Sequence, residues 1–136
     1  MERGMRIEKN FINEIYCMDC MDLFPQIPDG FVSLILTDPP YGISYQNQFT
    51  KRKHLVLTGD DGFDYGGFAK ESYRILQDNS HAYFFTRFDC YPYHFQCLER
   101  AGFSIKNCLV IEKGTVGGIG DLRGSYANNS EWIIFC

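Results

Sequence analysis

The feature that most constrains the fold is an apolar run over residues 31–36 that ends at the turn Asp38-Pro39-Pro40-Tyr41. A run of this length is typical of a strand buried on both faces of a parallel sheet. Asp29-Gly30 before it is a turn signal, and the two prolines after it cannot continue a strand ladder. The sequence therefore predicts a central strand with Asp38 and Tyr41 at its carboxyl end.

Strand-like and helix-like segments alternate along the rest of the chain. Strands are expected at 15–17, 81–86, 103–111 and 132–135, and helices at 21–26, from Gly66-Gly67 to Asp78-Asn79, and at 91–100 before Gly102. This alternation predicts a parallel α/β sheet, in which ligands bind at the carboxyl ends of the strands. No repeat or linker divides residues 1–136, which we interpret as one domain with an extension at 1–12 and a polar loop at 44–62.

The charge of the chain argues against a protein that coats phosphate over its whole surface. The formal net charge of the 136 residues is −4, and the one dense basic cluster is Lys51, Arg52 and Lys53 with His54 beside them. These residues either contact nucleic-acid phosphate or form a solvated loop. No signal-peptide pattern is found and no apolar run reaches membrane length, so we expect a cytoplasmic protein without a membrane partner.

The cysteine pattern favours buried thiols over a metal site. Cys17 and Cys20 have the spacing of zinc or redox ligands, but the six cysteines include no second close pair. Free cysteine behaves as a small apolar residue. We therefore expect no metal.

The Asp38–Tyr41 turn has the chemistry to act on the amino group of a nucleobase. The lone pair of such a nitrogen is delocalised into the ring, so a methylating site must hold both N–H bonds with fixed acceptors. The Asp38 carboxylate and a proline carbonyl can supply them, since Pro39 and Pro40 stiffen the turn. The Tyr41 ring can stack on a base that has been flipped out of the duplex. The alternative is a simple strand stop, because Asp-Pro is also a common turn former.

Asp-Pro-Pro-Tyr directly after a buried strand resembles the catalytic motif of the DNA amino-methyltransferases. Residues 15–23 resemble this family's segment that ends in Gly-Asp-Cys, although Met18 stands in place of the usual Gly. Residues 120–126 and 131–135 resemble the segment between its late strands. The resemblance implies a Rossmann-like S-adenosylmethionine-dependent methyltransferase sheet.

The resemblance also implies an activity and its residues. The activity is methyl transfer from S-adenosylmethionine to adenine N6 in double-stranded DNA, with cytosine N4 as the rival target. The catalytic residues would be Asp38, Pro39, Pro40 and Tyr41, and the cofactor would contact Asp19, Asp38 and Pro39. The alternative for Asp19 is a helix N-cap. A catalytically silent nucleic-acid-binding subunit is the alternative for the whole chain.

The order of the motifs resembles that of the beta-type enzymes, in which the catalytic motif comes before the Gly-rich cofactor loop. We interpret Gly117-Gly118-Ile119-Gly120 as a flexible loop rather than that cofactor loop. The expectation is therefore an incomplete sheet without the C-terminal strands, inactive alone. Its exposed edge could pair with the missing part or with a second copy.

Overall fold

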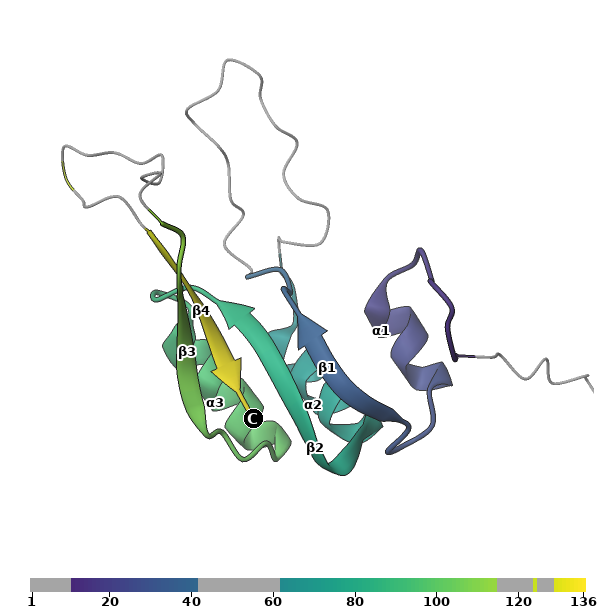
Figure 1. Cartoon of the computed structure of the whole chain (residues 1–136). Coiled ribbons are helices and arrows are strands. Elements are labelled where there is room, and N and C mark those ends of the chain that lie inside the picture. The colour runs from purple at the N-terminus through teal and green to yellow at the C-terminus, as the bar shows by residue number, and fades with distance from the viewer. Residues whose placement is uncertain (1–10, 42–61, 115–123, 125–128) are drawn as a thin grey trace, which may run out of the picture.

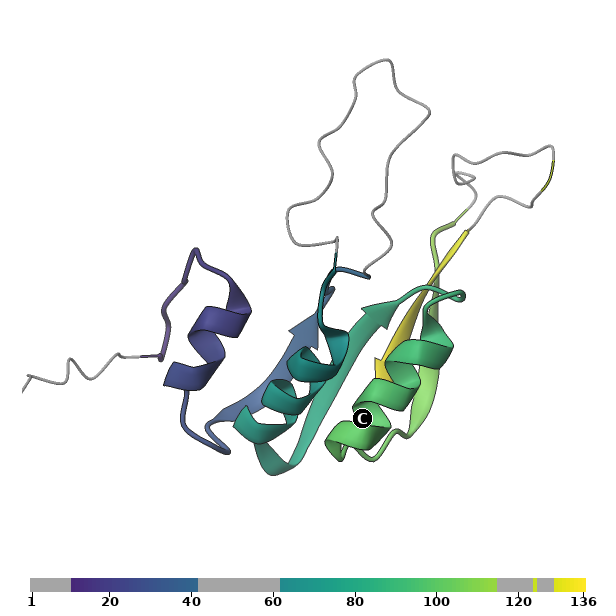
Figure 2. The same cartoon turned by 180° about the vertical axis from the view of Figure 1, so that it is seen from behind.

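The computed structural model describes residues 11–41, 62–114, 124 and 129–136. They form a four-stranded sheet with two helices on one face (Figures 1 and 2). The elements are α1 (Cys20–Leu23), the 3-10 helix η1 (Phe24–Gln26), β1 (Val32–Thr37), α2 (Tyr65–Ile75), β2 (Leu76–Thr86), α3 (Tyr91–Ala101), β3 (Asn107–Glu112) and β4 (Ser130–Phe135).

The sheet is mixed rather than parallel. Its strand order is β1-β2-β4-β3, and β1 runs parallel to β2. β4 lies between β2 and β3 and is antiparallel to both. The expected α/β architecture is confirmed, but the expectation of an all-parallel sheet is wrong. Apolar runs do not encode strand direction, and β3 and β4 follow one another without a predicted crossover helix, as antiparallel partners can.

The predicted strand at 15–17 is not formed. These residues have no regular secondary structure, and the Ile15 side chain is 98% exposed. None of the described strands pairs with this segment, and a three-residue apolar run cannot form a strand without a partner. The chain instead turns into α1, where the Asp19 side chain caps the first turn.

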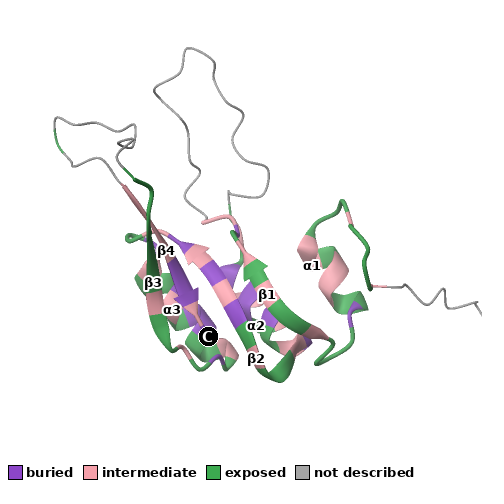
Figure 3. Ribbon diagram, viewed as in Figure 1, coloured by how far each residue is buried: buried purple, intermediate pink, exposed green. Residues whose placement is uncertain are grey.

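β1 is buried on one face only. Ile35 packs against the core, whereas Leu34 is 52% exposed and Leu36 is 66% exposed. Figure 3 shows this exposed face of β1, and α2 and α3 both cover the other face of the sheet, behind it in Figure 1 and in front of it in Figure 2. The expectation of burial on both faces is therefore wrong. Among the described strands β1 pairs with β2 alone, so it forms an edge of the sheet.

The core lies between the sheet and the two helices. Phe84 of β2 and Ile134 of β4 face Phe68 of α2 and Leu98 of α3, and all four are nearly or fully inaccessible to solvent. Burying side chains of this size stabilises the fold by about 1.5–3 kcal/mol each. This layer fixes α2 and α3 against the strands that carry the candidate site.

The helix ends follow the signals in the sequence. α2 begins one residue before the predicted Gly66-Gly67, with the Asp64 carboxylate accepting a hydrogen bond from the backbone of Gly67 at 3.0 Å. A Cβ at position 67 would overlap with that carboxylate, which explains the glycine. α3 ends at Gly102, whose φ of 112° favours glycine, as predicted.

Arg74 of α2 joins the N-terminal segment to the rest of the fold. Its guanidinium donates to the backbone carbonyls of Phe24 at 2.6 Å and Ile27 at 2.9 Å, and to the Asp29 carboxylate at 2.5 Å. Glu71 on the same helix also accepts from it, at 2.9 Å. One side chain thus connects α2 to the segment from η1 to the start of β1.

Arg74→Ala should lower the free energy of unfolding, because it removes a donor from the partly buried carbonyl of Ile27 and one of the two donors from that of Phe24. We expect a loss of about 1–3 kcal/mol, measured by urea denaturation. Lys70→Ala is the matched control, since Lys70 is an exposed cation on the same helix. Equal stability of the two variants would show that Arg74 does not hold this segment.

The cysteines follow the expectation in part. Cys90, Cys97 and Cys136 are buried and Cys20 is half-buried, but Cys17 is exposed. Cys17 was expected to be buried in a strand that does not form. Within the described residues no cluster of potential metal ligands occurs, and no helix is long and apolar enough to cross a membrane.

Candidate active site

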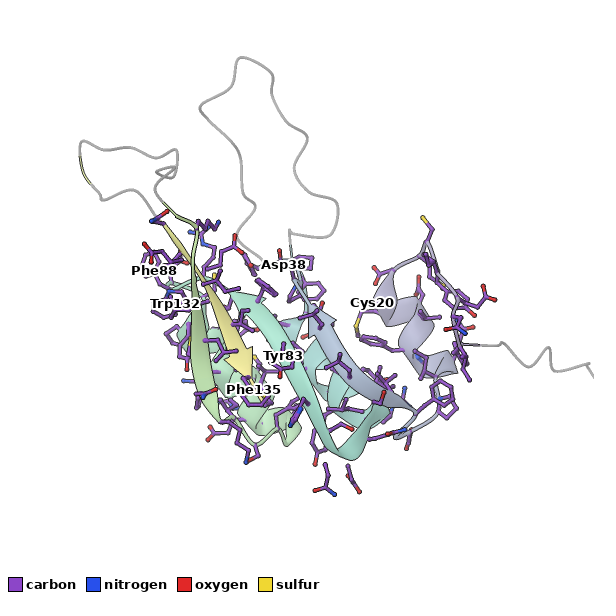
Figure 4. The ribbon with its side chains drawn as sticks, in the orientation of Figure 1. Cys20, Asp38, Tyr83, Phe88, Trp132 and Phe135 are labelled. Atoms are coloured by element: carbon purple, nitrogen blue, oxygen red, sulfur yellow. The ribbon has the colours of Figure 1, made fainter. Side chains whose placement is uncertain are left out.

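The predicted catalytic turn lies where the sequence analysis placed it, directly after β1 (Figure 4). The Asp38 side chain is exposed, Pro39 is buried and Tyr41 is partly buried. The Tyr41 hydroxyl donates a hydrogen bond to Asp38 Oδ1 at 2.5 Å. The carboxylate and the aromatic ring of the motif are therefore held together before any ligand binds.

The hydrogen bond leaves part of the Asp38 carboxylate available. Oδ1 accepts from Tyr41, and no donor in the described part of the chain reaches Oδ2. A carboxylate has about four acceptor positions, so an incoming N–H group can bind here. The neighbouring prolines have fixed φ angles and limit the motion of the backbone carbonyls on either side.

Tyr41 is held in its neutral, donating form. Burial raises the pKa of Tyr41 above its usual value, and the hydrogen bond to Asp38 raises it further. Ionisation of the hydroxyl would place a second negative charge beside the carboxylate. The hydroxyl is therefore a hydrogen-bond donor to Asp38 throughout the neutral range, and the ring of Tyr41 is fixed by this bond at one end.

A buried histidine of α3 lies against the Tyr41 ring. The ring centroids of Tyr41 and His94 are 5.8 Å apart, and the His94 ring is stacked on Tyr65 with centroids 3.8 Å apart and planes within 3°. His94 Nδ1 shares a 2.8 Å hydrogen bond with the hydroxyl of Thr86, the last residue of β2. Residues from the turn after β1, from the end of β2, and from α2 and α3 thus lie together at one end of the strands.

This histidine is neutral. Burial lowers the pKa of His94 to about 4, and the negative charge of Asp89 opposes the shift only in part. Asp89 is itself paired with Arg87, at 2.8 Å. The imidazole beside Tyr41 therefore carries no charge near pH 7.

The sequence analysis missed His94, Thr86 and Tyr65. One signal was present: His94 is one of three histidines in the chain, and it stands in a helix whose other inward-facing residues are apolar. A polar residue at such a position needs a partner. That the partner is Thr86 follows only from the packing of α3 on β2.

The other predicted site residues are placed as follows. Asp19 is the N-cap of α1, with Oδ1 accepting from the backbone of Met21 at 2.8 Å, so its alternative interpretation is confirmed. Its role at the cofactor stays a prediction. Lys51, Arg52 and Lys53 lie outside the described residues, as do residues 117–120.

Comparison with solved structures defines the class of fold. The chain superimposes on M1.HpyAVI in its S-adenosylmethionine complex with a TM-score of 0.61, at 16% sequence identity. It superimposes with a TM-score of 0.60, also at 16% identity, on a Thermus thermophilus protein proposed to be a DNA modification methylase. The predicted Rossmann-like methyltransferase sheet is confirmed by these matches, which establish the fold alone.

One curated protein adds a relationship in sequence. The chain is 27% identical over 124 residues to the Type II methyltransferase M1.MboII of Moraxella bovis. No protein-family model matches the chain.

The chain spans only part of these proteins. The alignment with M1.MboII covers 91% of the chain and 45% of that protein. The superpositions cover 90% of the chain and 51% of M1.HpyAVI, and 86% of the chain and 49% of the Thermus thermophilus protein. The chain thus spans about half the length of the proteins that it matches.

Proposed function

We propose that this chain carries the methyl-accepting site of an S-adenosylmethionine-dependent DNA methyltransferase that acts on adenine N6. The observation that supports this most is the position of the Asp38–Tyr41 pair. It lies at the carboxyl end of β1, with an exposed carboxylate and a fixed ring, in a fold shared with DNA methyltransferases. The relationship to M1.MboII supports the same class of activity.

In this proposal the residues of the turn act on a base that has left the duplex. Asp38 accepts a hydrogen bond from one N–H of the amino group through Oδ2, which accepts none from the described residues. A carbonyl of the proline pair accepts from the second N–H. These two bonds hold the nitrogen close to tetrahedral geometry. Its lone pair then points out of the plane of the base and toward the methyl donor. The Tyr41 ring stacks on the base and contributes about 1–3 kcal/mol to its binding.

S-adenosylmethionine would supply the methyl group as an electrophile on its sulfonium centre. Asp19 fits a contact with it, because its side chain is exposed and its Oδ2 is not used by the N-cap bond. Asp38 and Pro39 would lie near the reactive end. Under this proposal Asp19 both caps α1 and binds the cofactor.

The experiment that tests the proposal is expression of the complete gene in a bacterial host that lacks DNA methylation. Single-molecule sequencing of the host DNA should then find N6-methyladenine at one short sequence. N4-methylcytosine in its place would favour the cytosine alternative. Soluble protein that binds DNA and leaves the host DNA unmodified would contradict the enzyme and support the silent subunit.

Lys51, Arg52 and Lys53 are proposed to contact DNA phosphate. Changing all three to Gln should weaken binding to every sequence alike and should flatten the dependence of log Kd on log salt by about 0.9 for each phosphate that is no longer neutralised. Fluorescence anisotropy with a target-site duplex and a scrambled duplex measures both slopes. A weakening confined to the duplex with the target site would show instead that these residues contact bases.

A further inference from the structure

Three buried residues that no comparison assigns lie next to the Tyr41 ring. His94 contacts the rings of both Tyr41 and Tyr65, and the Thr86 hydroxyl shares a hydrogen bond with its imidazole. Thr86, His94 and Tyr65 are all almost completely buried, with exposed fractions of 3%, 0% and 1%. They are therefore part of the folded framework and do not reach solvent.

Packing alone does not explain why His94 and Tyr65 carry polar atoms in the core. Within the described residues, His94 Nε2 and the Tyr65 hydroxyl are buried without a hydrogen-bond partner. Each such atom destabilises the folded state, because it gives up its hydrogen bonds to water. Phenylalanine would fill either position without this loss, so the polar atoms call for another explanation.

The hydrogen bond to Thr86 gives the imidazole a property that phenylalanine lacks. It fixes the rotation of the ring about its own side-chain bond, and the stack on Tyr65 fixes its plane. Tyr41 is bound at its hydroxyl by Asp38, and its ring lies beside this fixed imidazole at a tilt of 43°. Tyr41 is thus held by two contacts, one at its hydroxyl and one at its ring.

We propose that His94 and Thr86 act together as positioning residues for Tyr41, and through it for the Asp38 carboxylate. This inference rests on the proposed function, because it concerns the same turn. The pair does not touch the reacting atoms. It sets the angle at which the Tyr41 ring receives the base, so its removal should lower turnover and leave the binding of the methyl donor unchanged.

The test uses His94→Phe and Thr86→Val in the protein expressed from its complete gene. Both changes nearly preserve shape and remove the hydrogen bond between the two residues. Each should lower kcat by about tenfold, as expected for a small misplacement of a reacting group, with KM for S-adenosylmethionine unchanged. His94→Phe removes Nε2, which has no partner among the described residues, but it also leaves the buried Thr86 hydroxyl with only its 3.4 Å bond to the Arg87 carbonyl, so kcat is compared per folded molecule.

The double variant distinguishes a shared role from two separate ones. If the pair acts as a unit, His94→Phe with Thr86→Val should lose about tenfold in kcat rather than a hundredfold, because contacting residues are not additive. Ile134→Val is the control for core damage. Ile134 is fully buried in β4 and pairs with Phe84, so this change should lower stability and leave kcat per folded molecule unchanged.

Asp38→Ala separates failure of this inference from failure of the proposed function. If Asp38→Ala is inactive while His94→Phe and Thr86→Val keep the full kcat, the positioning role is wrong and the site stands. A hundredfold loss in the double variant also contradicts a shared role. If Asp38→Ala itself keeps its activity, the proposed function is wrong.

Discussion

Asp38→Ala should abolish methyl transfer and leave the binding of S-adenosylmethionine largely intact. Asp38 is exposed at the end of β1, so its removal costs the fold little. In the proposed mechanism the change deletes one of the two acceptors that hold the amino nitrogen. Loss of one preorganised hydrogen-bonding group typically costs about 10²–10³ in rate, and a charged group can cost more.

A methyl-transfer assay with radiolabelled donor measures the loss, and isothermal titration measures donor binding. Asp78→Ala is the matched control, because Asp78 is an exposed carboxylate near the opposite end of β2. Near-normal turnover by Asp38→Ala would remove this residue from the mechanism. If binding of S-adenosylmethionine were lost as well, Asp38 would act in binding the cofactor instead.

The substitutions Tyr41→Ala and Tyr41→Phe should lower kcat/KM by different amounts. Tyr41→Ala removes the ring, and with it stacking of about 1–3 kcal/mol, or roughly a fivefold to 150-fold loss in kcat/KM. Tyr41→Phe keeps the ring and removes only the donor to Asp38. A hydrogen bond to a charged group contributes about 1.5–3 kcal/mol at most, and the carboxylate can turn to water, so we expect a smaller loss.

The comparison of the two Tyr41 variants is made with kcat/KM on a duplex that contains the target site. Replacement of the target adenine by 2-aminopurine adds a direct readout, because stacking on the ring quenches the fluorescence of a flipped base. Tyr41→Phe should retain this quenching and Tyr41→Ala should lose it. Equal losses of rate in both variants would place the role of Tyr41 in its hydroxyl.

Local signals predicted much of the fold. The strands at 81–86 and 132–135 and the helix at 91–100 were predicted within a few residues, except that β2 begins at Leu76. Their apolar spacing and the terminal Gly102 are properties of the segments themselves. The position of Asp38 was predicted in the same way, because an apolar run followed by two prolines fixes where a strand ends.

The errors concern contacts between distant segments. The expectation at 15–17 failed because a strand needs a neighbour that the segment itself does not provide. The exposed face of β1 and the direction of β4 depend on which elements cover or adjoin them. His94 was missed for the same reason, since its contact with Tyr41 exists only once α3 packs on β2 near the turn that follows β1. A one-dimensional pattern carries none of this information.

The reversed direction of β4 has a consequence for how such a protein can diversify. β3 ends at Glu112 and β4 begins at Ser130, and these residues pair at the same end of the strands as Asp38. Lys113 and Glu131 form an ion pair there. Under the proposed function, the connection between β3 and β4 therefore starts and ends beside the methyl-accepting turn. Sequence changes in this connection would be a route to new DNA preferences that leaves the paired residues of β3 and β4 unchanged.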